Sequence, residues 1–80
     1  MIRVTVKIST TLREYVPQYN PEIPFEVEIE EGNLVSDLAI KLNIPINEIK
    51  IVMVNGCQSE IDTLLRDRDR VAYFPAVGGG

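Results

Sequence analysis

The sequence contains no histidine and only one cysteine, Cys57. Structural zinc sites combine several Cys and His ligands, and nucleophilic hydrolases pair a Ser or Cys with a His. Neither arrangement can be assembled from these residues. The twelve acidic residues show no spacing that singles out a catalytic pair of carboxylates. The sequence therefore predicts no metal site and no active site of its own.

Basic residues are in the minority, with eight Lys and Arg against twelve Asp and Glu, so the net charge is −4. Such a chain is repelled by phosphate, and we expect no nucleic-acid partner. No apolar stretch approaches the ~20 residues of a membrane-spanning helix, so no membrane association is expected. The lone cysteine and the absence of a targeting pattern before the first strand favour a cytoplasmic protein.

What the sequence does contain is typical of one small globular domain. Its 80 residues are 45% hydrophobic and 25% charged, without a low-complexity run. A chain of this length buries only roughly 60% of the surface that it exposes when unfolded, which leaves little room for a large internal site. We predict one domain over residues 1–75 and a flexible glycine-rich tail over residues 76–80.

The first half of the chain shows two alternating patterns. "IRVTVKI" (2–8) and "FEVEIE" (25–30) alternate apolar and polar residues, which predicts two half-buried strands. Between them, "LREYV" (12–16) predicts a short helix that Pro17 ends. The main helix is predicted after residue 34, where apolar residues recur at spacings of three and four. Either Asn33 or Ser36 could cap it.

The second half of the chain predicts three more strands. Ile49–Val54 has no polar face, so we expect a central strand that is buried on both sides. Asn55-Gly56 predicts a tight hairpin turn into a short strand. "RVAYF" (70–74) predicts the final strand. The order of strand, strand, helix and three strands is typical of an α+β fold.

After this last strand the chain runs "PAVGGG" (75–80). Glycine loses more backbone entropy on ordering than any other residue, so an ordered glycine run would be unstable without a partner. Two interpretations stay open for these residues. The tail is a frayed terminus, or another protein holds it.

Several of these stretches carry a resemblance to a known family. From "IVMVNG" (51–56) through "LLRDRDRVAYFPAVGGG" (64–80), with support from "LREYV" and "EEGNLVSDL" (30–38), the chain resembles the ubiquitin-like β-grasp sulfur carriers. The similarity is strongest to the small subunit of molybdopterin synthase. It implies a β-grasp roll, in which a mixed sheet of four to five strands packs on one main helix.

The resemblance also implies a function. A ubiquitin-activating-like enzyme would adenylate Gly80 with ATP, and Gly80 would then become a thiocarboxylate. The sulfur would pass to a pterin precursor held by the large subunit of molybdopterin synthase, which would supply the substrate pocket and its basic groups. The chain would bind no cofactor and would be a carrier rather than an enzyme. The same terminus would also serve a thiamine-type carrier or a ubiquitin-like protein modifier, and an inert interaction domain remains the third alternative.

By the same resemblance, Gly78 and Gly79 would thread through a partner channel too narrow for a side chain. Pro75, with its fixed φ, would stiffen the exit of the tail. Partner contacts are expected from Phe74, Pro75, Val77 and Arg70, although Phe74 could equally belong to the core.

The turn before the last strand departs from the family pattern. Arg68 stands where the family usually has glycine. If the position needs a positive φ, Arg68 is strained by about 1 kcal/mol or more, or the turn differs.

Overall fold

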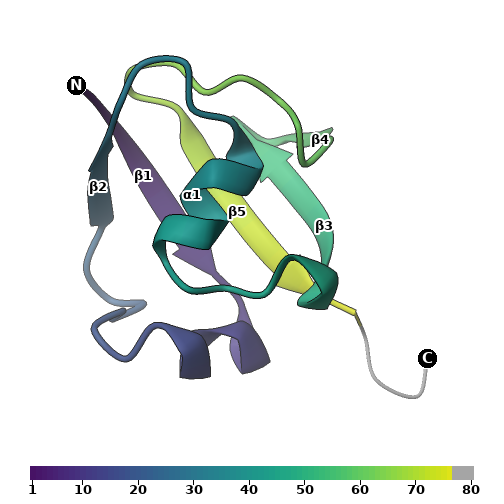
Figure 1. Cartoon of the computed structure of the whole chain (residues 1–80). Helices are drawn as coiled ribbons and strands as arrows, with labels where there is room; N and C mark the ends of the chain where they lie inside the picture. The colour runs from purple at the N-terminus through teal and green to yellow at the C-terminus, as the bar shows by residue number, and fades with distance from the viewer. Residues whose placement is uncertain (77–80) are drawn as a thin grey trace.

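The structure, a computed structural model, describes residues 1–76. The predicted site residues Val77, Gly78, Gly79 and Gly80 lie outside the described residues. The elements, shown in Figure 1, are β1 (Ile2–Ile8), the 3₁₀ helix η1 (Thr10–Tyr15), β2 (Phe25–Ile29), α1 (Val35–Lys41), the 3₁₀ helix η2 (Ile46–Glu48), β3 (Ile49–Val54), β4 (Cys57–Ser59) and β5 (Arg70–Pro75).

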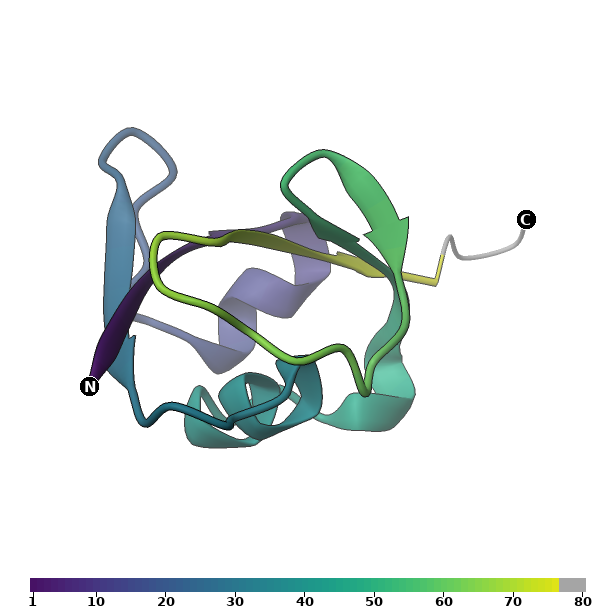
Figure 2. The ribbon, with the colours of Figure 1, turned by 90° about the horizontal axis from the view of Figure 1, so that it is seen from above.

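The five strands form one sheet in the order β2-β1-β5-β3-β4. β1 and β5 run parallel, and the other neighbouring pairs are antiparallel. The helix α1 lies across one face of this mixed sheet, as Figures 1 and 2 show from two directions. The predicted α+β architecture, a mixed sheet of four to five strands with one main helix, is therefore confirmed.

The hydrophobic core fills the space between the sheet and α1. The inward residues of the two middle strands are almost completely buried, among them Val4, Val6 and Val71, and they meet Leu38 and Ala39 of α1. We call the opposite side of the sheet, whose side chains point away from α1, the outer face. Because a strand alternates its side chains, every second residue of β1 and β5 lies on this outer face.

Tyr73 of β5 connects the sheet to the helix through the core. Its side chain is fully buried, and its hydroxyl donates a hydrogen bond of 2.7 Å to the carbonyl of Val35 at the start of α1. A buried hydroxyl requires such a partner. Burial also raises the pKa of Tyr73, because the phenolate would lose its hydration.

The prediction that Ile49–Val54 is central and buried on both sides was wrong. β3 lies second from the sheet edge, and β5 is the central strand. Only Val52 of β3 is buried, whereas Ile51 on the outer face is 39% exposed. The reason is that α1 covers only one face of the sheet. The apolar residues of β3 therefore alternate between side chains that face the core and side chains that lie on the outer face.

Two local predictions also need correction. Neither Asn33 nor Ser36 caps α1; instead Leu34 precedes the helix and donates its N–H to the Asp37 carboxylate over 2.8 Å. The short first helix, η1, is a 3₁₀ helix. The hairpin turn is confirmed, since Asn55 and Gly56 adopt φ values of 53° and 82° between β3 and β4.

The turn before β5 places Arg68 at a positive φ, the case in which strain is expected. Arg68 adopts φ 71°, a region that favours glycine. The Asp69 N–H closes the turn on the Arg66 carbonyl over 3.1 Å, and the Arg68 N–H donates to the Arg3 carbonyl over 2.7 Å. The turn is therefore fixed to β1 by the same hydrogen bonds that hold Arg68 in its unfavourable conformation.

Candidate functional site at the end of the central strand

Ala76 directly follows β5, the central strand of the sheet, which has a hydrogen-bonded neighbour on each side. β5 pairs with β1 on one side as far as Tyr73 and with β3 on the other side as far as Pro75. Tyr73 also accepts a hydrogen bond of 3.1 Å at its carbonyl from the Ser9 N–H. Because both edges of β5 are bonded, the sheet fixes the point at which Ala76 leaves it.

An apolar patch lies on the outer face beside this point. It consists of Ile51 and Met53 of β3 with Ala72 and Phe74 of β5, and we use the name apolar patch for these four residues. Ile51 pairs with Phe74, and Met53 pairs with Ala72, so the four side chains form two adjacent cross-strand pairs. Phe74 is half-buried and lies in this patch rather than in the core between sheet and helix.

Pro75 borders a small cavity on the side of the 3₁₀ helices. The cavity has a volume of about 260 Å³ and is lined by Thr11, Leu12, Glu14, Tyr15, Glu48, Pro75 and Ala76. The Tyr15 hydroxyl donates to Glu48 Oε1 over 3.3 Å. Partial desolvation, followed by the nearby Glu48 charge, raises the pKa of Tyr15. Two carboxylates, those of Glu14 and Glu48, thus flank the start of the tail.

The structure does not bring Arg70 together with Phe74 and Pro75. Arg70 opens β5 and lies four positions before Phe74, a distance of about 13 Å along the strand. Its N–H donates to Asn55 Oδ1 over 2.9 Å, and its side chain is exposed on the outer face. Arg70 therefore belongs to a second region of the same face.

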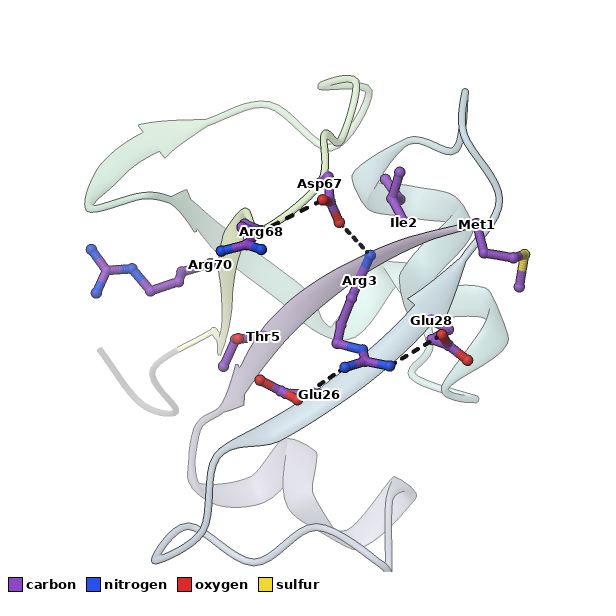
Figure 3. Close-up of a pocket in the computed structure, with 9 residues that line it drawn as sticks. All are labelled: Met1, Ile2, Arg3, Thr5, Glu26, Glu28, Asp67, Arg68 and Arg70. Atoms are coloured by element: carbon purple, nitrogen blue, oxygen red, sulfur yellow. Dashed lines mark hydrogen bonds and ion pairs between the residues drawn. The ribbon is translucent and has the colours of Figure 1, made fainter.

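That second region is a charged hollow of about 600 Å³, shown in Figure 3. Its lining comprises Met1, Ile2, Arg3, Thr5, Glu26, Glu28, Asp67, Arg68 and Arg70. Figure 3 shows Arg3 between Glu26 and Glu28, at 4.0 and 3.3 Å from their carboxylates. Asp67 accepts the Arg3 N–H over 2.9 Å.

Sequence reasoning missed several residues of these two regions. Ile51 and Met53 alternate with Val52 and Val54, which are equally apolar, so the sequence carries no signal for an exposed outer side of β3. Glu14 and Glu48 gave no signal, because only the fold brings residues so distant in sequence to one place. The same holds for Arg3 and Asp67, which lie 64 positions apart.

The described residues present two surface regions, the apolar patch and the charged hollow. Within residues 1–76, no group of three His, Cys, Asp or Glu side chains is placed to hold a metal ion. In the same part of the chain, none of the helices has the length and apolar character needed to cross a membrane. The arrangement sets an apolar surface beside the end of β5, which suits contact with another protein.

Solved structures with the same fold include two that are 25% identical to this chain. The putative molybdopterin converting factor subunit 1 of Pyrococcus furiosus has a TM-score of 0.71, and the alignment covers 96% of this chain and 100% of that one. The HVO 2177 protein of Haloferax volcanii has a TM-score of 0.69, with 99% and 87% covered. Small archaeal modifier protein 1 of Haloferax volcanii, at 17% identity and a TM-score of 0.72 over 96% and 100%, shares the fold.

These similarities confirm the predicted ubiquitin-like β-grasp fold, because each extends over nearly the whole of this chain. Among curated proteins, none matches the sequence significantly. The family model described as Mut7-C ubiquitin matches residues 1–78, which is almost the entire chain. The chain therefore belongs to the Mut7-C ubiquitin family.

Proposed function

We propose that this protein is a sulfur carrier. Its C-terminal Gly80 is adenylated with ATP and thiocarboxylated, and it donates sulfur to a pterin precursor as the small subunit of a molybdopterin-synthase-like complex. The similarity to a putative molybdopterin converting factor subunit 1 supports this choice of complex. The observation that carries the proposal is the position of the apolar patch beside the end of β5.

The chemistry of a C-terminal glycine requires help from outside. A free α-carboxyl group has a pKa of about 3.3 to 3.7, so at neutral pH it is an unreactive carboxylate. A carboxylate oxygen of Gly80 attacks the α-phosphorus of ATP, and pyrophosphate leaves. A sulfur nucleophile, such as a persulfide, then displaces AMP from the acyl adenylate. Reductive cleavage of the S–S bond by a thiol leaves the thiocarboxylate.

None of these steps needs a catalytic group on the carrier, so the partners supply them. A ubiquitin-activating-like enzyme binds ATP, and the large subunit holds the pterin precursor. Phe74, Pro75 and Val77 dock the body of the carrier, while Gly78 and Gly79 thread the terminus into the partner. Fully extended, residues 76–80 reach about 17 Å at 3.3 to 3.6 Å per residue. This length places the carboxyl group inside a partner while the folded body stays outside.

Protein modification is the second candidate function. The fold is shared with small archaeal modifier protein 1, whose name describes such an activity. The adenylated Gly80 would then be transferred to a lysine amine, and AMP would leave as the isopeptide bond forms. A thiamine-type carrier differs only in the acceptor of the sulfur. Isopeptide adducts in host cells would favour the modifier, and copurification with a pterin-binding subunit favours the synthase.

The decisive experiment is mass spectrometry of the C-terminal peptide. The full chain is incubated with the activating enzyme of its host, ATP and a sulfur source. We expect one oxygen of the Gly80 carboxyl group to be replaced by sulfur. A variant lacking Gly79 and Gly80 is the matched control and should remain uncharged.

The intact mass of the protein isolated from its host first establishes that Gly80 ends the mature chain. If the wild-type terminus stays a plain carboxylate under conditions that charge an authentic carrier, the sulfur-carrier proposal is wrong.

A further inference from the structure

Asn55 and Gly56 form the turn of the β3–β4 hairpin, and both are exposed to water. Of the five asparagines in the chain, Asn55 is the only one that a glycine follows. Glycine has no Cβ to shield its backbone nitrogen. The space beside Gly56 is open as well, with no atom beyond its chain neighbours within 4 Å of the position that a Cβ would take. The Gly56 nitrogen is therefore the least hindered backbone nitrogen that follows an asparagine.

The side chain of Asn55 joins this hairpin to the turn before β5. Its Nδ2 donates to Asp69 Oδ1 over 2.9 Å, and its Oδ1 accepts the Arg70 N–H over 2.9 Å. The Asn55 N–H also donates to the Arg70 carbonyl over 2.8 Å. Asp69 in turn fixes its own loop, since its Oδ2 accepts the Arg66 N–H over 2.8 Å. We call the two hydrogen-bonded side chains Asn55 and Asp69 the amide clamp.

The amide clamp requires an amide at position 55, because a carboxylate there has no hydrogen to donate. Asp69 Oδ1 is an acceptor, so it can face the NH2 group of Asn55 at 2.9 Å but not a carboxylate oxygen. With an aspartate at position 55, two acceptors of like charge would meet at this contact and repel each other. Exchange of one NH2 group for an oxygen is therefore enough to turn an attractive contact into a repulsive one.

We propose that Asn55 is a site of spontaneous deamidation and that this modification opens the amide clamp. The Gly56 nitrogen loses its proton to base and attacks Asn55 Cγ. A succinimide ring closes as the new C–N bond forms, and the bond from Cγ to the side-chain nitrogen breaks so that ammonia leaves. Water then opens the ring at either carbonyl, which gives an aspartate or an isoaspartate. The net reaction takes up one water and releases one ammonia, without an oxidant, a cofactor or an enzyme.

The amide clamp stands at one end of the β3–β5 ladder that carries the apolar patch. The strand pair nearest to the clamp is Val54 with Val71. The pair after that, Met53 with Ala72, belongs to the apolar patch. Deamidation therefore loosens the strand pairing beside the surface to which the proposed function assigns docking.

The fold slows this reaction without preventing it. Ring closure requires rotations within residue 55 that the turn and the two side-chain hydrogen bonds oppose, so it proceeds from an opened hairpin. Such opening is local, because β4 has only three residues and lies at the edge of the sheet. Each hydrogen bond of the side chain slows the reaction by a factor of a few. We therefore expect deamidation in the folded chain to be roughly tenfold slower than in an unstructured peptide.

Mass spectrometry of the full chain measures the reaction. The reduced protein is incubated at mildly alkaline pH beside an acetylated and amidated peptide of residues 52–58, and both are sampled over time. We expect replacement of the side-chain NH2 by OH at Asn55 in both, with the slower rate in the full chain. Asn43 is the internal control, because it also has a positive φ but precedes Ile44. If Asn55 in the full chain deamidates no faster than Asn43, the inference is wrong.

Two variants of the turn before β5 test whether the amide clamp protects Asn55. Asp69→Ala removes the acceptor of the Asn55 Nδ2 and should accelerate deamidation several-fold. Asp67→Ala is the matched control, because Asp67 belongs to the same turn but accepts the Arg3 N–H instead. Equal rates in the Asp69→Ala variant and the wild type would contradict the role of the clamp.

Thermal melting of a reciprocal pair of variants tests the consequence of the modification. Asn55→Asp reproduces the deamidated side chain and should lower Tm by roughly 4–8 °C, the shift that loss of one hydrogen bond produces in a domain of this size. The double variant Asn55→Asp/Asp69→Asn exchanges donor and acceptor across the clamp and should recover most of this loss. An Asn55→Asp variant as stable as the wild type, or a double variant no more stable than Asn55→Asp, would overturn the inference.

Discussion

Arg68 adopts a positive φ, which is unfavourable for an arginine. Within residues 1–76, three residues other than glycine have positive φ, namely Asn43, Asn55 and Arg68. Asparagine tolerates this region because its short polar side chain bonds locally, but arginine has no such compensation. The hydrogen bond from the Arg68 N–H to the Arg3 carbonyl holds the strain in place. Arg68 therefore occupies a conformation that glycine would adopt at lower cost.

Replacing Arg68 with glycine should stabilise the protein. The change Arg68→Gly relieves the contact of Cβ with the backbone and should raise the free energy of unfolding by about 1 kcal/mol. Arg68→Ala keeps the Cβ and should leave it nearly unchanged. Urea denaturation measures both. Equal stability of the glycine and alanine variants would show that the turn is not strained at this residue.

Tyr73 makes stability depend on pH in alkaline solution. Its pKa in the folded state is raised above the ordinary value of about 10. The folded state therefore favours the protonated phenol, and the stabilisation is complete below pH ~10 and lost as the pH rises beyond it. Tyr73→Phe should cost about 1 kcal/mol at neutral pH through the lost bond to Val35, and it should flatten the fall in Tm at high pH.

The control for this prediction is Tyr19→Phe, because the Tyr19 hydroxyl makes no hydrogen bond to residues 1–76 and its ring packs edge-on against Phe25. Melting curves recorded between neutral and strongly alkaline pH compare the two variants. The same alkaline slope in Tyr73→Phe and the wild type would assign the pH dependence to other groups.

At the scale of elements, alternating strands could be predicted from sequence and the position of β3 could not. β1 and β2 alternate because one face meets the core and the other meets water. β3 is apolar throughout because its outer residues, Ile51 and Met53, form the apolar patch. Hydrophobicity alone does not distinguish burial by the core from a surface that a partner covers. The strand β3 itself could be predicted, but its neighbours in the sheet and the exposure of its outer residues could not.

The apolar patch predicts that an outward change on β3 impairs docking without unfolding the domain. Ile51→Glu should change the free energy of unfolding by less than ~1 kcal/mol, since Ile51 is already 39% exposed. It should weaken binding to the activating enzyme roughly tenfold, because a charge is buried without a partner. Isothermal titration calorimetry measures the affinity.

Ile40→Glu is matched to this variant, since Ile40 is 62% exposed but lies on α1, away from the outer face. Its affinity for the enzyme should equal that of the wild type. Equal weakening by both substitutions would indicate a general effect of negative charge rather than a docking surface.

At the scale of the whole molecule, the fold class and the hairpin could be predicted from the sequence, and the roles of Phe74 and Pro75 stay proposals. The sequence did not reveal that Glu14 and Glu48 lie near the end of β5, whereas Arg68 and Arg70 lie near its start. Glu14 and Glu48 line one cavity with Pro75, and Asp67 accepts the Arg3 N–H, because the pairing of β5 with β1 and β3 brings distant segments together. The arrangement of charges on a surface depends on the tertiary structure. The composition determines only the net charge of −4.

The central claim is that the carboxyl group of Gly80 is activated by an enzyme that recognises the body of this protein. ATP–pyrophosphate exchange with the host's activating enzyme tests it most directly, since exchange requires reversible formation of an acyl adenylate. We predict exchange that depends on the added chain, is abolished by removal of Gly79 and Gly80, and is reduced by Ile51→Glu but not by Ile40→Glu. Exchange that is absent with the intact chain, or unaffected by removal of the two glycines, would contradict the account.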